Sequence, residues 1–331
     1  MRKLASRWLE EIWYRDHFVG TWLMPFSMLF MDAVKFRRWL YKKNYKPTTK
    51  LAVPVIIVGN ITVGGTGKTP LVIYLVKQLQ AAGFKPAVIS RGYGRKDDAP
   101  EIVTAKSEAG LVGDEPLLIA QQTNVPVVVG ANRVAAGQLL LDSENCDVII
   151  ADDGLQHYAL QRDIEIVVID GERRFGNNFC LPSGPLREPQ ERIREADFII
   201  CNGGDDLEDD EILMTLQGAE AVNLFTEERK PLDDFKTLNC TAFAGIGNPQ
   251  RFFNHLQGFG IECEGKKFPD HYDYSLKDIS FNGAEAILMT EKDAVKCKSF
   301  ATEQHWYVPV VATFETDFSQ RLITLLRTKY E

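Results

Sequence analysis

The sequence predicts an α/β protein with a mostly parallel sheet, helices on both faces of that sheet, and a second, smaller α/β lobe. Two observations support this prediction. Up to about residue 200, short apolar runs rich in β-branched residues alternate with helical segments or polar loops. Such runs are typical of parallel strands that are buried on both faces. After about Gly203 the pattern changes, and a second series of strands is expected.

Length and composition limit the possible classes of protein. The chain has 331 residues, 45% of them hydrophobic and 25% charged, which suits one large or two modest α/β domains. The formal net charge of −8 argues against a nucleic-acid partner. The six cysteines form no C-x-x-C pair, so we expect reduced thiols in a cytosolic compartment. Nothing in the sequence implies a protein partner.

Residues 1–45 form the first predicted unit, a segment that associates with membranes. The first 50 residues hold 11 Lys and Arg against 4 Asp and Glu, and four of the five Trp. The apolar stretch there is shorter than the about 20 residues that a membrane span needs. Beyond Pro25, apolar side chains recur on one helical face with charges opposite, which favours a helix lying on anionic lipid. The alternative is a helix packed on its own domain. The apolar face consists of Phe26, Leu29, Phe30, Ala33, Phe36 and Leu40.

The remaining units are a core at residues 46–203 and a smaller lobe at residues 204–331. In the core, a helix from about Thr69 to Ala82 follows the first strand, and the acidic residues 205–211 beyond it are expected to form a solvated loop. Both lobes could also share one continuous sheet. Core strands are predicted at residues 53–58, 87–90, 125–129, 148–151, 164–169 and 198–201. Strands of the smaller lobe are predicted at residues 221–225, 241–244, 286–290 and 307–312, before a final helix from Asp317.

The turn after the first strand carries the strongest chemical signal. It fits the pattern G-x-x-x-x-G-K-[ST], except that Thr62 stands where the first glycine is usual. In such a turn, backbone N–H groups surround phosphate oxygens, Lys68 reaches the β- and γ-phosphates, and the Thr69 hydroxyl can bind Mg²⁺. We therefore predict a P-loop NTPase-type sheet with a nucleoside triphosphate bound by Thr62, Val63, Gly64, Gly65, Thr66, Gly67, Lys68 and Thr69.

This motif does not separate a kinase from an ATPase switch or a GTPase. No N-K-x-D motif for guanine is present, and the nearest sequence, Thr290-Glu291-Lys292-Asp293, differs at its first residue. ATP is therefore favoured over GTP.

Two acidic corners are candidates for magnesium contacts. The strand at residues 148–151 ends in Asp152 and Asp153, the layout that places a carboxylate beside the magnesium ion of a P-loop. The alternative is a turn or a helix cap. Asp114 and Glu115 form the second corner, which is a helix N-cap, a general base or a magnesium contact.

A third group surrounds His271, one of five histidines. The neighbouring Asp270 would orient the imidazole and raise its basicity, and an acceptor hydroxyl needs a group that takes its proton. The alternative is an ordinary surface or core histidine. Arg91, Arg95 and Arg187 could hold phosphate bidentately or be exposed loop arginines.

In their order along nearly the whole chain, these segments resemble the tetraacyldisaccharide 4′-kinase family of lipid A biosynthesis in Gram-negative bacteria. The resemblance rests on the basic, aromatic N-terminus and on residues 58–60, 64–70, 90–94, 113–116, 152–157, 181–189, 268–271 and 290–293.

The resemblance implies a kinase at the cytoplasmic face of the bacterial inner membrane. It would move the γ-phosphate of ATP to the 4′-hydroxyl of a tetraacylated glucosamine disaccharide 1-phosphate, in a cleft that closes between two lobes. Asp114 would be the base, assisted by His271, which Asp270 orients. Lys68 would stabilise the transferred phosphoryl group. The residues around Mg²⁺ would be Thr69, Glu115, Asp152 and Asp153.

Two other functions remain possible from the residues alone. One is a membrane-associated ATPase switch without a lipid acceptor. The other is a soluble small-molecule kinase whose N-terminal helix is packed on the domain.

Overall fold

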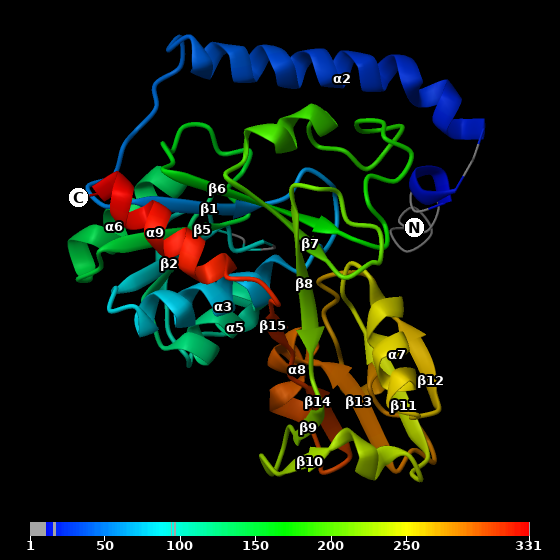
Figure 1. Ribbon diagram of the computed structural model, residues 1–331. Coiled ribbons are helices and arrows are strands. Elements are labelled where there is room, and N and C mark those ends of the chain that lie inside the picture. The colour runs from blue at the N-terminus through cyan, green and yellow to red at the C-terminus, as the bar shows by residue number, and fades with distance from the viewer. Residues whose placement is uncertain (1–10, 16–17, 94, 96, 331) are drawn as a thin grey trace.

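The computed structural model describes residues 11–15, 18–93, 95 and 97–330, and its named strands form two sheets (Figure 1). The larger sheet has nine strands in the order β15-β8-β7-β6-β1-β5-β2-β4-β3. The strands from β8 to β4 are parallel, and the edge strands β15 and β3 are antiparallel to their neighbours. The mostly parallel sheet predicted from the sequence is therefore confirmed. Its strands are β1 (Val55–Gly59), β2 (Pro86–Ser90), β3 (Glu101–Val103), β4 (Val127–Val129), β5 (Val148–Asp152), β6 (Ile164–Asp170), β7 (Phe198–Asn202), β8 (Glu211–Gln217) and β15 (Val311–Thr313).

Helices cover both faces of the larger sheet, which explains the uninterrupted apolar runs. Along β1, Ile56 and Val58 belong to the core cluster under α3, α5 and α9, whereas Val55 and Ile57 belong to the cluster under α6. Side chains on a strand that is buried on both faces are therefore mostly apolar. The helices are α3 (Lys68–Ala81), α4 (Ala109–Val112), α5 (Asp114–Thr123), α6 (Arg133–Ser143) and α9 (Phe318–Tyr330).

The smaller sheet has six strands in the order β10-β9-β14-β13-β11-β12, so the two lobes do not share one sheet. Its two core clusters include residues of α7 (Pro249–Gly258) and of α8 (Glu291–Cys297), respectively. The strands are β9 (Glu220–Asn223), β10 (Arg229–Pro231), β11 (Cys240–Ala244), β12 (Cys263–Lys267), β13 (Ala286–Thr290) and β14 (His305–Val308).

The chain enters the smaller lobe after β8 and returns to the larger sheet at β15. The prediction of a single strand at residues 307–312 is wrong, because this region contains parts of two strands, β14 and β15, which lie in different sheets. Pro309 lies at the break and has no N–H group for a sheet ladder. The strands β8 and β15 and the helix α9 follow residue 203 in the chain but belong with the larger sheet. The predicted division of the chain into units at residue 203 stays a prediction.

A single long helix, α2 (Phe18–Lys42), lies across one side of the larger lobe (Figure 1). It begins before Pro25 and continues through it, although the helical pattern was expected only beyond that proline. Its buried residues are Gly20 and Ser27, and among the described residues no helix is long and apolar enough to cross a membrane. Large exposed apolar side chains on α2 are Phe18, Trp22, Phe26, Met28, Leu29, Phe36 and Trp39.

Candidate active site

The phosphate loop, residues 62–67, connects β1 to α3 as the motif requires. Gly64 and Gly67 have φ angles of 106° and 93°, in the left-handed region that favours glycine. A side chain on Gly67 would also collide with Asn202, because its Cβ would lie 2.2 Å from Nδ2 of that residue. Lys68 is the first residue of α3, so the loop opens onto the positive end of a helix.

Two asparagines that were not among the predicted site residues hold the phosphate loop in place. The side chain of Asn60 donates to the backbone oxygens of Thr62 and Gly64 at 2.9 and 3.4 Å. Asn202 donates from Nδ2 to the oxygen of Thr66 at 3.0 Å. Both asparagines directly follow or end a buried strand beside the loop. That position is the signal by which the sequence could have identified them.

Lys68 meets the predicted acidic pair directly. Its Nζ lies 3.3 Å from Oδ1 of Asp153 and donates to Oδ1 of Asn60 at 3.1 Å. Arg187, one of the candidate phosphate clamps, also pairs with Asp153, at 3.1 Å. Burial alone would raise the pKa of Asp153, but Lys68 and Arg187 lower it well below its ordinary value. Asp153 is therefore a carboxylate at neutral pH.

Asp152 has a different environment, although it is the adjacent residue. It is completely buried at the end of β5, and Oδ2 accepts a hydrogen bond from Ser90 at 3.3 Å. Burial, followed by repulsion from Glu115, raises the pKa of Asp152 to about 7. The second acidic corner lies nearby, because a Cβ on Gly113 would lie 3.2 Å from Cα of Gly92, two residues beyond Ser90.

Magnesium fits this arrangement. Oδ1 of Asp152 is buried and accepts no hydrogen bond, and Oγ1 of Thr66 in the phosphate loop is likewise buried without a hydrogen-bond partner. A cation there would favour the charged form of Asp152 and so oppose the effect of burial on its pKa. Within the described part of the chain, no three His, Cys, Asp or Glu residues cluster tightly enough to form a metal cage. Mg²⁺ bound with a nucleotide does not need one, since phosphates and water supply most ligands.

Asp114 and His271 form a hydrogen-bonded pair between the lobes. Nδ1 of His271 lies 3.0 and 3.1 Å from the two carboxylate oxygens of Asp114. Burial would raise the pKa of Asp114, but Lys292 and His271 reverse this and hold it well below its ordinary value. Burial would lower the pKa of His271, but the hydrogen bond that its ring donates to Asp114 raises it overall. The resemblance implied that His271 assists Asp114, and the two residues, which come from distant motifs, are in contact in the structure.

Asp270 has a weaker relation to the imidazole than expected. Its Oδ1 lies 3.8 Å from Nε2 of His271 and accepts the backbone N–H of His271 at 3.0 Å. The carboxylate that contacts a ring nitrogen within hydrogen-bond distance is Asp114. Asp270 instead supports the backbone of His271, which has a positive φ of 56°.

Lys292 is the main residue of the site that was not among the predicted site residues. Its Nζ donates to Glu115 at 2.8 Å and to Asp270 at 3.1 Å, and thus joins the two lobes. It belongs to the segment that resembles a guanine motif. The acid of that segment, Asp293, is buried and accepts hydrogen bonds from Gly245 N, Tyr274 and Thr290. These are contacts within the smaller lobe, so the segment has a structural explanation.

The other arginines divide between the site and its surroundings. Arg95 bonds Leu111 O, Ala99 O and Glu101, so its contacts hold a surface loop. Arg91 is exposed just beyond β2. Arg133, which the sequence did not single out, donates to the backbone oxygen of Asp153 at 3.3 Å, and burial lowers its pKa to about 10.

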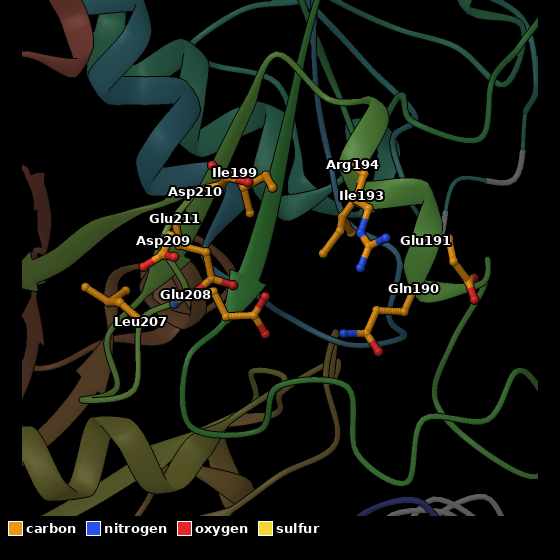
Figure 2. A pocket seen from close by; sticks show the side chains of 10 residues that line it. All are labelled: Gln190, Glu191, Ile193, Arg194, Ile199, Leu207, Glu208, Asp209, Asp210 and Glu211. Carbon is orange, nitrogen blue, oxygen red and sulfur yellow. The ribbon is translucent and has the colours of Figure 1, made fainter.

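A separate cavity of about 590 Å³ lies away from these residues (Figure 2). It is lined by residues of η1 (Gln190–Glu195) on one side and by residues 207–211 before and at the start of β8 on the other. None of the predicted site residues lines it.

The fold and the site define a P-loop enzyme of the kinase class. A sequence model of the family described as LpxK, tetraacyldisaccharide-1-P 4'-kinase, matches residues 19–327. The tetraacyldisaccharide 4'-kinase of Actinobacillus pleuropneumoniae serotype 5b is 50% identical over 318 residues, which are 95% of this chain and 97% of the relative. That of Nitrosococcus oceani is 45% identical over 324 residues, covering 97% and 95%.

A solved structure agrees with these relatives. The crystal structure of LpxK from Aquifex aeolicus in complex with ATP has a TM-score of 0.80 and 33% sequence identity. The match covers 95% of this chain and 100% of that chain. The chain belongs to the tetraacyldisaccharide 4'-kinase family, and the predicted family and P-loop-type α/β fold class are confirmed.

Proposed function

We propose that this chain transfers the γ-phosphoryl group of ATP to the 4′-hydroxyl of a tetraacylated glucosamine disaccharide 1-phosphate, a step of lipid A biosynthesis. The observation that carries the proposal is the Asp114–His271 pair, which shares a site with the phosphate loop through Glu115 and Asp152. An ATPase switch needs the loop and the acids but no buried proton acceptor for an alcohol. The family membership supports the same substrate.

The proton of the acceptor hydroxyl goes to the Asp114–His271 pair, with Asp114 as the base and His271 assisting. Both carboxylate oxygens face the imidazole, so the pair takes up the proton as a unit. The acceptor oxygen forms a bond to the γ-phosphorus while the bond to the β,γ-bridging oxygen breaks, and ADP leaves with that oxygen. Asp270 holds the backbone of His271, as its hydrogen bond indicates.

Lys68 stabilises the charge on the transferred phosphoryl group. Its ammonium is preorganised between Asn60 and Asp153, so it does not have to be ordered when the transition state forms. The other residues of the phosphate loop supply backbone N–H groups to the phosphates. Thr69, Glu115, Asp152 and Asp153 would hold Mg²⁺, which would supply positive charge to the phosphate oxygens.

We also propose that α2 rests on the cytoplasmic face of the bacterial inner membrane. Its exposed aromatic side chains and its many lysines and arginines support this arrangement, because such helices lie among anionic headgroups. The acyl chains of the acceptor would stay in the bilayer while its sugar reaches the cleft. A soluble kinase with a packed leader would have buried this apolar face.

The test is transfer of labelled γ-phosphate to a tetraacyldisaccharide 1-phosphate in mixed micelles. We expect label in the lipid, absent when the acceptor lacks a free 4′-hydroxyl. Slow release of inorganic phosphate that the acceptor does not alter would favour the ATPase switch instead.

A further inference from the structure

Residues 181–187, here called the bridging segment, lie between α2 and the phosphate loop. At one end, the backbone N–H of Ser183 donates to Oγ of Ser27 at 2.9 Å. The hydroxyl of Ser183 donates to the oxygen of Gly20 at 2.6 Å. Ser183 is completely buried, and Gly20 and Ser27 are the buried residues of α2. The bridging segment therefore holds the helix at its two most enclosed positions.

The other end of the bridging segment pairs with the phosphate loop. The N–H of Val63 donates to the oxygen of Pro185 at 2.8 Å, and the N–H of Arg187 donates to the oxygen of Ile61 at 2.6 Å. Thr62 and Leu186 form the β-bridge between these two bonds. Arg187 then reaches Asp153, which also contacts Lys68. A single residue, Gly184, separates Ser183 from Pro185, the first contact with the loop.

The bridging segment is too constrained to absorb a displacement. The N–H of Leu181 donates to the oxygen of Leu186 at 2.9 Å, and Asn177 donates to the oxygen of Ser183 at 2.8 Å. Gly184 has no space for a side chain, because a Cβ there would lie 2.2 Å from both Asn177 Oδ1 and Phe179 O. Movement of Ser183 must therefore move Pro185, and with it the loop.

Both buried residues of α2 make polar contacts with Ser183. Phe30 and Met31 pack only partly against the core, whereas the larger apolar residues of the helix face outward. The two hydrogen bonds with Ser183 thus contribute to the position of the helix near Gly20 and Ser27.

We propose that Ser183 is a positioning residue that couples the seating of α2 to the geometry of the phosphate loop, and so to nucleotide affinity. This rests on the proposed function, because it takes the loop to bind ATP. The coupling acts in both directions, since a helix position that changes nucleotide affinity is itself changed by the nucleotide. The membrane helix and the phosphate loop thereby act as one unit.

The test measures binding of a non-hydrolysable ATP analogue with Mg²⁺ to the full chain in detergent micelles, by calorimetry and without acceptor. Ser27→Ala and Ser183→Ala each remove one hydrogen bond of the contact. We expect each to weaken binding about 3- to 10-fold, the equivalent of one net hydrogen bond. Both are measured well below their own unfolding temperatures, so that a loss of stability alone does not lower affinity.

Two variants serve as matched controls. Gly20→Ala keeps both hydrogen bonds, and its new Cβ would make only ordinary contacts at 3.6 Å and beyond, so affinity should be unchanged. Ser280→Ala removes a serine-to-carbonyl bond of 2.6 Å on the exposed surface of the smaller lobe and should also bind as the unaltered chain. Unchanged affinity in Ser27→Ala and Ser183→Ala would overturn the coupling alone. Absence of binding by the unaltered chain would overturn the nucleotide site as well.

Discussion

Nζ of Lys292 lies 2.8 Å from Oε1 of Glu115, so α8 of the smaller lobe supplies a cation to the first turn of α5 in the larger lobe. The same ammonium contacts Asp270 beside His271. Burial alone would lower the pKa of Lys292, but Glu115 and Asp270 raise it well above the ordinary value. The two lobes therefore meet at a buried network of charges within the candidate site.

Replacement of Lys292 with methionine should destabilise the protein by about 3–5 kcal/mol, because it leaves two carboxylates without their cation. Lys298→Met is the matched control, since the pair that it breaks is exposed and 3.9 Å long. That control should cost about 0–1 kcal/mol. Urea denaturation of the two variants measures the difference. Equal midpoints would show that the network contributes nothing to the fold.

Replacement of Lys68 with alanine should reduce phosphoryl transfer about 10²–10³-fold, the usual effect of removing one preorganised charge from a transition state. Lys77→Ala, on the exposed side of the same helix, should leave transfer unchanged. The measurement is the initial rate with labelled ATP at saturating acceptor. Activity near that of the unaltered chain in Lys68→Ala would exclude the assigned role.

Replacement of His271 with alanine, or of Asp114 with alanine, should lower turnover about 10²–10⁴-fold, the range for loss of a general base. In the unaltered chain, kcat/KM should fall as pH decreases through the raised pKa of His271, because the pair then already holds a proton. The acid limb should therefore lie above about pH 6.5, the ordinary histidine value. A profile flat across this range would contradict a base built on this pair.

The raised pKa of His271 also determines how the stability of the folded protein depends on pH. A group whose pKa is higher in the folded state contributes stability below its unfolded pKa and loses it as pH rises through the folded pKa. The gap in unfolding free energy between the unaltered chain and His271→Asn should thus be larger at about pH 6 than at about pH 9. A gap that grows toward alkaline pH would refute the upward shift.

Binding of Mg²⁺ with a nucleotide should release protons at pH 7. Burial raises the pKa of Asp152 to about 7, so a fraction of the molecules carries a proton on it, and a bound cation would displace that proton. Calorimetry in buffers of different ionisation enthalpy measures the release. It should be lost in Asp152→Asn and after chelation of the metal.

Exposed apolar residues of α2 should determine membrane binding. Trp22 and Leu29 are 77% and 68% exposed, and replacement of either by serine should weaken binding to anionic vesicles about tenfold. Phe225→Ser, a residue of the smaller lobe that is 63% exposed, is the control and should bind vesicles normally. Sedimentation with vesicles measures the membrane binding of the three variants. Nucleotide affinity should be unaltered in all three variants.

The sequence predicted the core strands and the phosphate loop because both depend on local patterns. Buried parallel strands require apolar runs, and the glycines around Lys68 are required by backbone geometry at that one turn. β8 was not predicted, since it lies next to the antiparallel edge strand and alternates buried with half-buried residues. Its chain neighbours are acidic, which made the region appear to be solvent-exposed loop.

Which residues meet in the site was harder to predict from the sequence than the motifs themselves. Asp114 and His271 are 157 positions apart, and only the packing of α5 against the smaller lobe brings them together. Lys292 could not be selected because a lysine at a helix start is common on protein surfaces. Asp152 and Asp153 are adjacent in sequence, yet burial and neighbouring charges shift their pKa values in opposite directions.

The route of the chain between the lobes limits how they can move. The smaller lobe is inserted between β8 and β15, which pair antiparallel beside each other. Two polypeptide crossings joined by ladder hydrogen bonds resist twisting and stretching more than they resist bending across the ribbon. A swing about that ribbon would change the separation of Lys292 from Glu115 without breaking the strand pairing within either sheet.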